Sequence, residues 1–220
     1  MGKRRSPIFV TLTLQNIVSS ARTSTFDLIA RGKHGDQQAF DRLFQKYRRR
    51  LAVLIHYKLG MQLRATLEVD DILQETLMRA FLDLERFNYM GQDSFMTWLS
   101  TIASHVIADA ARSRGRQRRQ AQLVRLRSAS NPAGPEPADR LTPSKILSRQ
   151  ENIAAIVAKL DRLPDAYRQA ILMAKMEGLS RTEIAERLGK TPEQATLLVH
   201  RAVKRLKELE QEQEQQQQQE

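Results

Sequence analysis

The sequence predicts an all-α protein of two small helical domains joined by a flexible linker, with a helix-turn-helix in the second domain. Apolar residues recur at helical spacing in several segments, and strand-like alternation is nearly absent. A stretch rich in Pro, Ala, Ser, Asn and Gly at 128–143 separates two helical regions. We therefore expect a disordered or misassigned extension at 1–25, a first domain at 26–119, a linker at 120–145, a second domain at 146–209 and a disordered Gln/Glu tail at 210–220.

Three helices are expected in the first domain. The first has an apolar stripe of Phe40, Leu43, Phe44, Tyr47, Leu51 and Leu54. The second runs from Val69 to Phe87, with Asp70 and Asp71 in its first turn, where the helix dipole favours acids. After a polar loop at 88–93, Ser94 is expected to cap the third, whose apolar residues are Phe95, Trp98, Leu99, Ile102, Val106 and Ile107.

The second domain carries strong local signals for two short helices joined by a tight turn. Ser180 and Glu183 have the spacing of a capping box, and Gly189 can take the left-handed conformation that ends a helix. Thr191 is then expected to cap the next helix, with Pro192 at its first position. Two helices so joined make a helix-turn-helix, whose second helix fits the major groove of DNA.

Composition favours a polyanionic partner. The chain has 36 Lys and Arg against 25 Asp and Glu, a formal net charge of +11, and no acidic residue between Ala110 and Pro135. No apolar run is long enough to span a membrane, and cysteine is absent, which excludes disulfides and thiolate metal sites. Lys3-Arg4-Arg5 before Ile8–Leu14 loosely imitates a signal peptide, but Thr11 and Thr13 interrupt its apolar run.

Catalysis is a weak alternative. Asp70, Asp71 and Glu75 could hold a nuclease metal, but no second acidic cluster has a recognisable spacing, and the four His residues at 34, 56, 105 and 200 are scattered. A glycine-rich phosphate loop is also absent. We therefore expect no enzymatic activity, no metal and no cofactor.

Three patches in this order resemble the extracytoplasmic-function sigma factors of bacterial RNA polymerase, over roughly residues 26–209. Asp71-Ile72-Leu73-Gln74-Glu75-Thr76 with Ala80-Phe81 resembles the polymerase-binding helix of that family. Phe95-Met96-Thr97-Trp98-Leu99 with Ile102-Ala103 and Asp109 resembles its promoter-melting helix. Leu163-Pro164, Gly178-Leu179-Ser180, Glu183-Ile184-Ala185 and Leu188-Gly189 resemble its second domain.

The resemblance implies a cytoplasmic initiation subunit whose partners are core RNA polymerase, promoter DNA and, plausibly, an anti-sigma protein, with no membrane insertion. Core polymerase would contact Asp71, Gln74, Glu75, Met78 and Arg79. The minus-ten element would contact Tyr89, Trp98, His105, Arg112, Arg114, Arg116, Arg118 and Arg119. The minus-thirty-five element would contact Lys190, Thr191, Gln194, Thr196, Leu197, His200, Arg201 and Lys204.

The chain departs from the family in its recognition helix. Gln194-Ala195-Thr196-Leu197-Leu198 stands where members commonly have Thr-Val-Lys-Ser-Arg, so a basic stretch has become largely apolar. Ser104-His105 likewise replaces a frequent Arg-Asn pair. Two other classes stay open from the residues alone: a dimeric helix-turn-helix regulator that does not bind polymerase, and a protein that binds anionic membrane surfaces through its basic segments.

Overall fold

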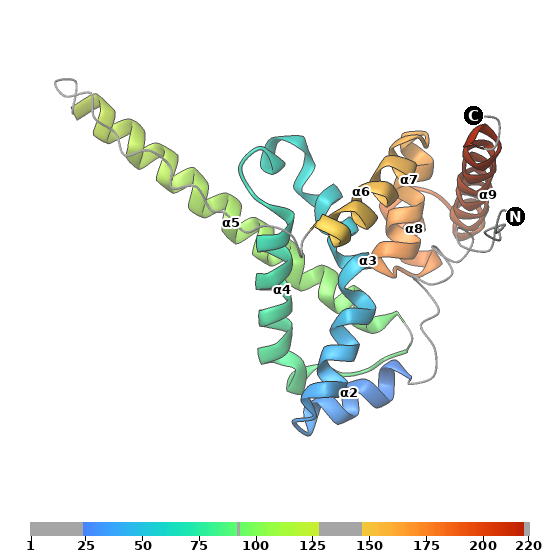
Figure 1. Cartoon of the computed structure of the whole chain (residues 1–220), viewed down its shortest axis with the longest axis horizontal. Helices are drawn as coiled ribbons and strands as arrows, with labels where there is room; N and C mark the ends of the chain where they lie inside the picture. The colour runs from blue at the N-terminus through green and yellow to red at the C-terminus, as the bar shows by residue number, and fades with distance from the viewer. Residues whose placement is uncertain (1–23, 92, 128–146, 218–220) are drawn as a thin grey trace, which may run out of the picture.

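The computed structural model describes residues 24–91, 93–127 and 147–217, and every regular element in these ranges is a helix. The all-α prediction is confirmed. In chain order the elements are α2 (Thr25–Lys33), α3 (Gln37–Arg64), α4 (Val69–Asp83), the 3₁₀ turn η2 (Leu84–Arg86), α5 (Ser94–Arg127), α6 (Leu147–Asp161), α7 (Asp165–Ile171), the π-helical turn η3 (Leu172–Glu177), α8 (Arg181–Leu188) and α9 (Pro192–Gln217), as Figure 1 shows.

Helices α2 to α5 form a first helical body around α3. Helices α3, α4 and α5 contact one another, and α2 covers α3. The predicted stripe of α3 is its buried face, since Phe40, Leu43, Tyr47, Leu51 and Leu54 are all buried. Two local caps fix the entry into these helices: Ser24 accepts from the Asp27 N–H and Asp36 from the Ala39 N–H.

One helix was expected from Val69 to Phe87, and that prediction is wrong after Asp83. The chain tightens there into the 3₁₀ turn η2, closed by a 3.1 Å bond from the Phe87 N–H to the Leu84 carbonyl. A 3₁₀ turn satisfies carbonyls that a helix end leaves unpaired. It also turns Leu84 and Phe87 inward, and both are buried.

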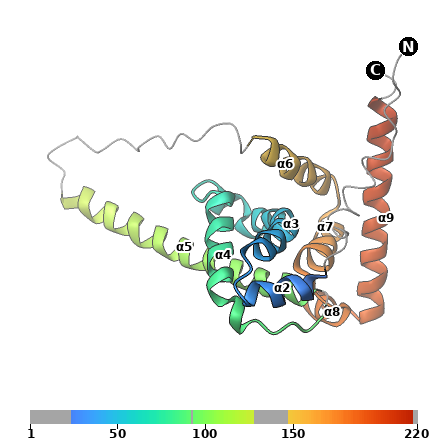
Figure 2. The ribbon, with the colours of Figure 1, turned by 60° about the horizontal axis from the view of Figure 1, so that its bottom comes forward.

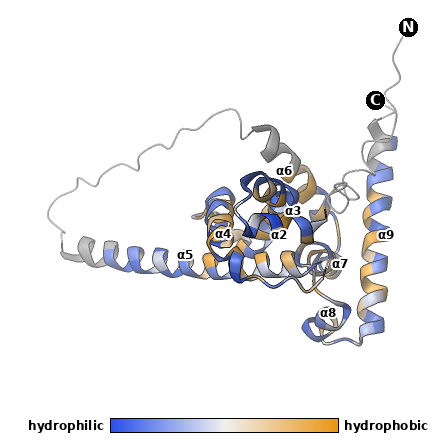
Figure 3. Cartoon of the chain, turned by 90° about the horizontal axis from the view of Figure 1, so that it is seen from below, coloured by the Kyte–Doolittle hydropathy of each residue, from blue (hydrophilic) through white to orange (hydrophobic). Residues whose placement is uncertain are grey.

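Helix α5 begins at Ser94, so the prediction that Ser94 caps it is wrong by one residue. Asp93 is the capping residue, since its carbonyl accepts the Thr97 N–H, while the Ser94 hydroxyl donates to the Gly91 carbonyl and closes the preceding loop. The far half of α5 projects from the body (Figure 1) and is mostly hydrophilic (Figure 3). The helix runs to Arg127, so the segment predicted as linker begins as helix, and residues 128–146 lie outside the described part.

A second body is formed by α6 to α9, with α7 and α8 both packed against the long α9 (Figure 2). Helix α9 continues to Gln217, into the segment expected to be a disordered tail. Gln and Glu are good helix formers, and the extension is fixed by ion pairs from Lys159 to Glu210 and from Arg205 to Glu212. The tail prediction is therefore corrected as far as Gln217. The predicted extension at 1–23 and residues 218–220 lie outside the described part.

The two bodies share one apolar core. Buried residues of the first body, among them Leu51 and Leu99, belong to the same cluster as Leu160, Ile171 and Met176 of the second. Helix α3 contacts α6 and η3, and α5 also contacts η3. The helix-turn-helix has a small separate core of Ile184, Ala185 and Ala195.

Candidate functional site

The outer face of α4 combines polar and large apolar side chains. Asp71, Gln74 and Met78 are exposed, while Glu75 and Arg79 are half-buried. Two residues that the sequence analysis did not place in the site extend this face: Phe81 is 55% exposed and Leu82 71%. They lie three and four positions after Met78, the spacing of neighbours on a helix surface. That spacing is the signal that could have identified them.

Arg79 ties α4 to α5. Its guanidinium donates to Glu75 at 2.7 Å and to Asp109 at 2.9 Å, and Arg112 donates to the other oxygen of Asp109 at 2.6 Å. The hydrogen bonds from Arg79 and then from Arg112 lower the pKa of Asp109, and the bonds to Asp109 and then to Glu75 raise the pKa of Arg79. Arg79 is therefore positioned by its own protein before any partner binds.

A polar loop with two aromatic neighbours joins η2 to α5. The Tyr89 ring is half-buried and lies 5.5 Å from the Phe26 ring of α2. Trp98 is also half-buried, between the rings of Phe87 at 4.8 Å and Phe95 at 5.5 Å. Both side chains pack partly against the core, Trp98 between two rings of α5 and the preceding loop, and Tyr89 in the loop beside Met90, which is 86% exposed.

The basic residues predicted on α5 lie along the projecting arm. The exposed side chains are those of Arg112, Arg114, Arg116 and Arg119. His105, about two helical turns before Arg112, is also exposed, and the side chain of Arg118 lies outside the described residues. Arg112 is partly neutralised by Asp109. The others are exposed positive charges distributed around a part of α5 that is mostly hydrophilic (Figure 3).

The local signals of the helix-turn-helix are confirmed. Ser180 accepts from the Glu183 N–H, and the Glu183 carboxylate accepts from the Ser180 N–H at 2.7 Å. The Ser180 side chain first, and its backbone N–H second, lower the pKa of Glu183. Gly189 has a left-handed backbone with φ 61°, and α9 begins at Pro192. The Thr191 hydroxyl accepts from the Gln194 N–H at 3.3 Å, which makes Thr191 the cap.

The residues predicted to contact DNA from α9 and from the turn before it are all exposed: Lys190, Thr191, Gln194, Thr196, Leu197, His200, Arg201 and Lys204. Ala195 and Ala202 are buried, and Val199 is half-buried. Gln194 has a second task that the sequence analysis missed, because its side-chain oxygen accepts from the Thr191 N–H at 3.1 Å. That bond occupies one of the two acceptor positions of the amide oxygen and leaves both amide N–H groups for a base edge.

Two other kinds of site were sought along residues 24–91, 93–127 and 147–217. No group of three or more His, Cys, Asp or Glu side chains in these ranges could hold a metal ion. Nor is any helix there both long and apolar enough to cross a bilayer.

Comparison with known proteins identifies the family of the chain. The sequence model of the ECF sigma factor family matches residues 22–196. The ECF RNA polymerase sigma factor BldN of Streptomyces coelicolor is 29% identical over 183 residues, which are 83% of this chain and 64% of BldN, so the chain spans less than two thirds of that relative. SigD of Mycobacterium bovis, another ECF sigma factor, is 26% identical over 200 residues, 91% of this chain and 90% of SigD.

Two solved structures are also similar. A complex of RsbN with BldN matches 83% of this chain and 99% of the solved chain, at 26% identity and a TM-score of 0.33. CnrH in complex with the cytosolic domain of CnrY matches 83% of this chain and 94% of the solved chain, at 22% identity and a TM-score of 0.39.

Proposed function

The chain belongs to the ECF sigma factor family, a non-enzymatic family, and we propose that it binds core RNA polymerase and directs promoter recognition and DNA melting at initiation. The first body, residues 26–119, would bind polymerase and the minus-ten element. The second, residues 146–209, would bind the minus-thirty-five element. Such a subunit acts in the cytoplasm, where polymerase meets DNA, and is open to control by an anti-sigma protein.

The outer face of α4 is the observation that carries the proposal. Met78, Phe81 and Leu82 are all more than half exposed on one face, next to Asp71 and Gln74. A contiguous apolar patch rimmed by polar residues is typical of a protein-binding surface. A helix with acids at its start and apolar residues beyond suits docking on another helical surface, as the family's polymerase-binding helix does.

Promoter melting would fall to the loop and the first half of α5. Opening a duplex costs roughly 1.4 kcal/mol per base-pair step, and stacking one base on an aromatic ring returns about 1–3 kcal/mol. Tyr89, at the loop surface, is the best-placed aromatic side chain for an extruded base. Arg114, Arg116 and Arg119 lie about 30 Å or more farther along α5, so they would neutralise phosphates at a distance from the loop, while Trp98 would pack against Phe87 where the loop begins.

In the second body, the helix-turn-helix would enter the major groove. Arg201 and Lys204 would hold phosphates, and the free amide of Gln194 would read a base edge. Leu197 is 49% exposed where the family commonly has a polar residue, so it would contact a thymine methyl group.

A matched pair of methionine variants tests polymerase docking. Met78 is 56% exposed on the proposed docking face, and Met61 is 82% exposed at the end of α3, away from that face. We expect Met78→Ala to weaken binding to core polymerase and to lower run-off transcription, and Met61→Ala to do neither. Binding is measured by fluorescence anisotropy with labelled protein. Equal affinities for the two variants would remove α4 from the docking surface, and DNA binding without any polymerase binding would favour a free-standing regulator.

A further inference from the structure

Helix α2 lies along the loop that joins η2 to α5. The Phe26 ring of α2 lies 5.5 Å from the Tyr89 ring of the loop, and the Lys33 ammonium donates to the Phe87 carbonyl at 2.6 Å. Phe26 and Lys33 are about two helical turns apart, so both lie on the same face of α2. The start of α2 and the loop proposed to bind an extruded base therefore form one surface.

Phe26 has the more open ring of this aromatic pair. It is 55% exposed, whereas Tyr89 is half-buried, and Met90, next to Tyr89 in the chain, is 86% exposed. The two rings are tilted by 59°, so they are not stacked face to face on each other. Thr25 and Leu28 on the same helix are buried, so the start of α2 is packed while the Phe26 ring stays outside the core. Large apolar side chains gathered at a surface mark a binding site.

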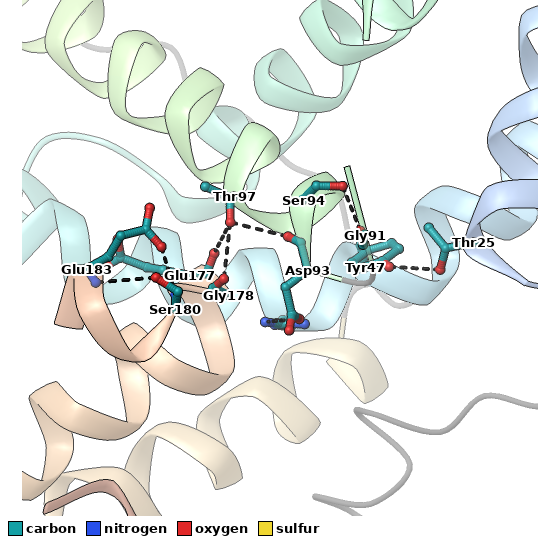
Figure 4. Close-up of polar contacts among 11 residues, drawn as sticks. Thr25, Tyr47, Gly91, Asp93, Ser94, Thr97, Glu177, Gly178, Ser180 and Glu183 are labelled. Atoms are coloured by element: carbon teal, nitrogen blue, oxygen red, sulfur yellow. Dashed lines mark hydrogen bonds and ion pairs between the residues drawn. The ribbon is translucent and has the colours of Figure 1, made fainter. Parts of the chain in front are cut away.

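Hydrogen bonds hold the backbone on both sides of the aromatic pair. At the start of α2, the Thr25 hydroxyl lies 3.0 Å from the Tyr47 hydroxyl (Figure 4). In the loop, the Ser94 hydroxyl accepts from the Met90 N–H at 3.1 Å and donates to the Gly91 carbonyl at 2.7 Å. A ring on such a fixed backbone loses little conformational freedom when a ligand stacks on it.

Two lysines supply positive charge at this surface, which the arginines of the α5 arm are too distant to do. Lys46 donates to the Thr25 hydroxyl at 2.9 Å, and Lys33 reaches the loop at Phe87. Neither lysine forms an ion pair with a carboxylate in the part of the chain that the structure describes. An ammonium has three donors, so each lysine keeps donors for a phosphate after its contact within the protein.

An exposed aromatic ring beside lysines is suited to single-stranded nucleic acid, because every base has a π-face and every linkage carries a phosphate. We infer that Phe26 is a further DNA-binding residue, on which one unpaired base of single-stranded DNA stacks beside Tyr89, with Lys33 and Lys46 at the adjoining phosphates. The inference deepens the proposed function and rests on it, since the unpaired strand is that of a melted promoter.

Two phenylalanines of equal exposure provide a matched test. Phe26 and Phe81 are both 55% exposed, but Phe81 lies on the face of α4 proposed to bind polymerase. Without polymerase, we expect Phe26→Ala to weaken binding of the full chain to a labelled single-stranded oligonucleotide of mixed sequence about 5- to 150-fold, the loss typical of one stacked base. Phe81→Ala should leave this affinity unchanged. Equal affinities for the two variants would overturn the inference.

Tryptophan at the same two positions reports stacking itself, which a packing role would not produce. Phe26→Trp keeps an aromatic ring, so its affinity for the oligonucleotide should be at least that of the wild-type chain. Stacking on a base quenches indole fluorescence. We therefore expect the oligonucleotide to quench the emission added by Phe26→Trp and not that added by Phe81→Trp, with wild-type Trp98 as the background. Unquenched emission from Phe26→Trp would contradict the inference.

Salt dependence tests the two lysines. Lys33→Gln and Lys46→Gln each remove a charge and keep an N–H donor for the contact within the protein. Each should reduce the slope of log affinity against log salt by about 0.7 on single-stranded DNA. Lys175→Gln changes an exposed lysine of η3 and should keep the wild-type slope. The same slope in all three variants would mean that Lys33 and Lys46 bind no phosphate.

The outcomes separate this site from the proposed function. If Phe26→Ala loses single-strand binding and the wild-type chain binds no core polymerase, the proposed function fails and the site stands. If the chain binds polymerase and Phe26→Ala binds the oligonucleotide as wild type does, the site fails and the proposed function stands. Weaker polymerase binding by Phe26→Ala with unchanged DNA binding would overturn the inference and assign Phe26 to the docking surface.

Discussion

Arg79 on α4 and Asp109 on α5 form an ion pair of 2.9 Å that joins the proposed polymerase-docking helix to the proposed promoter-melting helix. Arg79 also reaches Glu75 on its own helix, so its side chain is already held by two carboxylates. A residue fixed in this way can present its remaining N–H groups to a partner with little further loss of entropy.

We expect Arg79→Ala to weaken polymerase binding more than Asp109→Ala does. Asp109→Ala removes the link between the helices and the pair with Arg112, whereas Arg79→Ala removes the link and the proposed contact with polymerase. Anisotropy titrations with core polymerase give both affinities, and urea unfolding should give similar, small losses of stability for the two variants. Equal affinities for the two variants would mean that Arg79 joins the two helices and makes no contact with polymerase.

Leu99 tests the core of the first body. It is fully buried in α5, as its place on the helical stripe predicts, so Leu99→Ala should lower the free energy of unfolding by about 2–5 kcal/mol. Leu197→Ala makes the same change at a residue that is 49% exposed, and should stay within about 0.5 kcal/mol. Urea denaturation followed by circular dichroism measures both. A neutral Leu99→Ala would contradict the packing of α5.

The sequence was sufficient for the helix-turn-helix, whose signals depend on neighbours in the chain, although the cap of α5 was misplaced by one residue. Ser180 with Glu183, Gly189 and Thr191 each act within three residues, and each was identified from its type and spacing. Helical periodicity likewise identified the buried face that includes Leu99. The individual contacts assigned to polymerase and DNA stay predictions.

The sequence was insufficient where distant segments decide the outcome. Nothing near Thr97 indicates that the turn at Gly178 will pack on it, because that contact joins segments about eighty residues apart. The 3₁₀ turn that begins at Leu84 also depends on packing between separate segments, because it places the Phe87 ring against the rings of Phe95 and Trp98 on α5. Local spacing carries no information on such packing.

The variant Arg201→Ala tests whether the helix-turn-helix binds DNA phosphates through this side chain. If its exposed guanidinium binds one phosphate, Arg201→Ala should reduce the slope of log affinity against log salt by about 0.9 on duplex DNA. Lys175→Ala removes one exposed positive charge from η3, outside the recognition helix, and should leave the slope unchanged. Anisotropy titrations of the full chain at several salt concentrations give the slopes. An unchanged slope for Arg201→Ala would mean that this side chain binds no phosphate.

His56 makes stability depend on pH. Burial and, second, the nearby Arg64 charge lower the pKa of His56 from 6.5, and Arg64 donates a hydrogen bond to its Nε2, which must therefore be unprotonated. A lowered folded-state pKa means that the unfolded chain binds the proton more readily. Stability from the neutral ring is therefore complete above about pH 6.5 and declines as the pH falls toward the folded-state pKa.

Thermal unfolding between pH 5 and pH 8 measures this effect. We expect the midpoint of the wild-type chain to fall more steeply below pH 6.5 than that of His56→Gln, whose side-chain oxygen can still accept from Arg64. His200→Gln replaces an exposed histidine on α9 and should keep the wild-type dependence. The same pH dependence in wild type and His56→Gln would mean that His56 has one pKa in the folded and unfolded chains, and that the contact with Arg64 leaves its protonation unchanged.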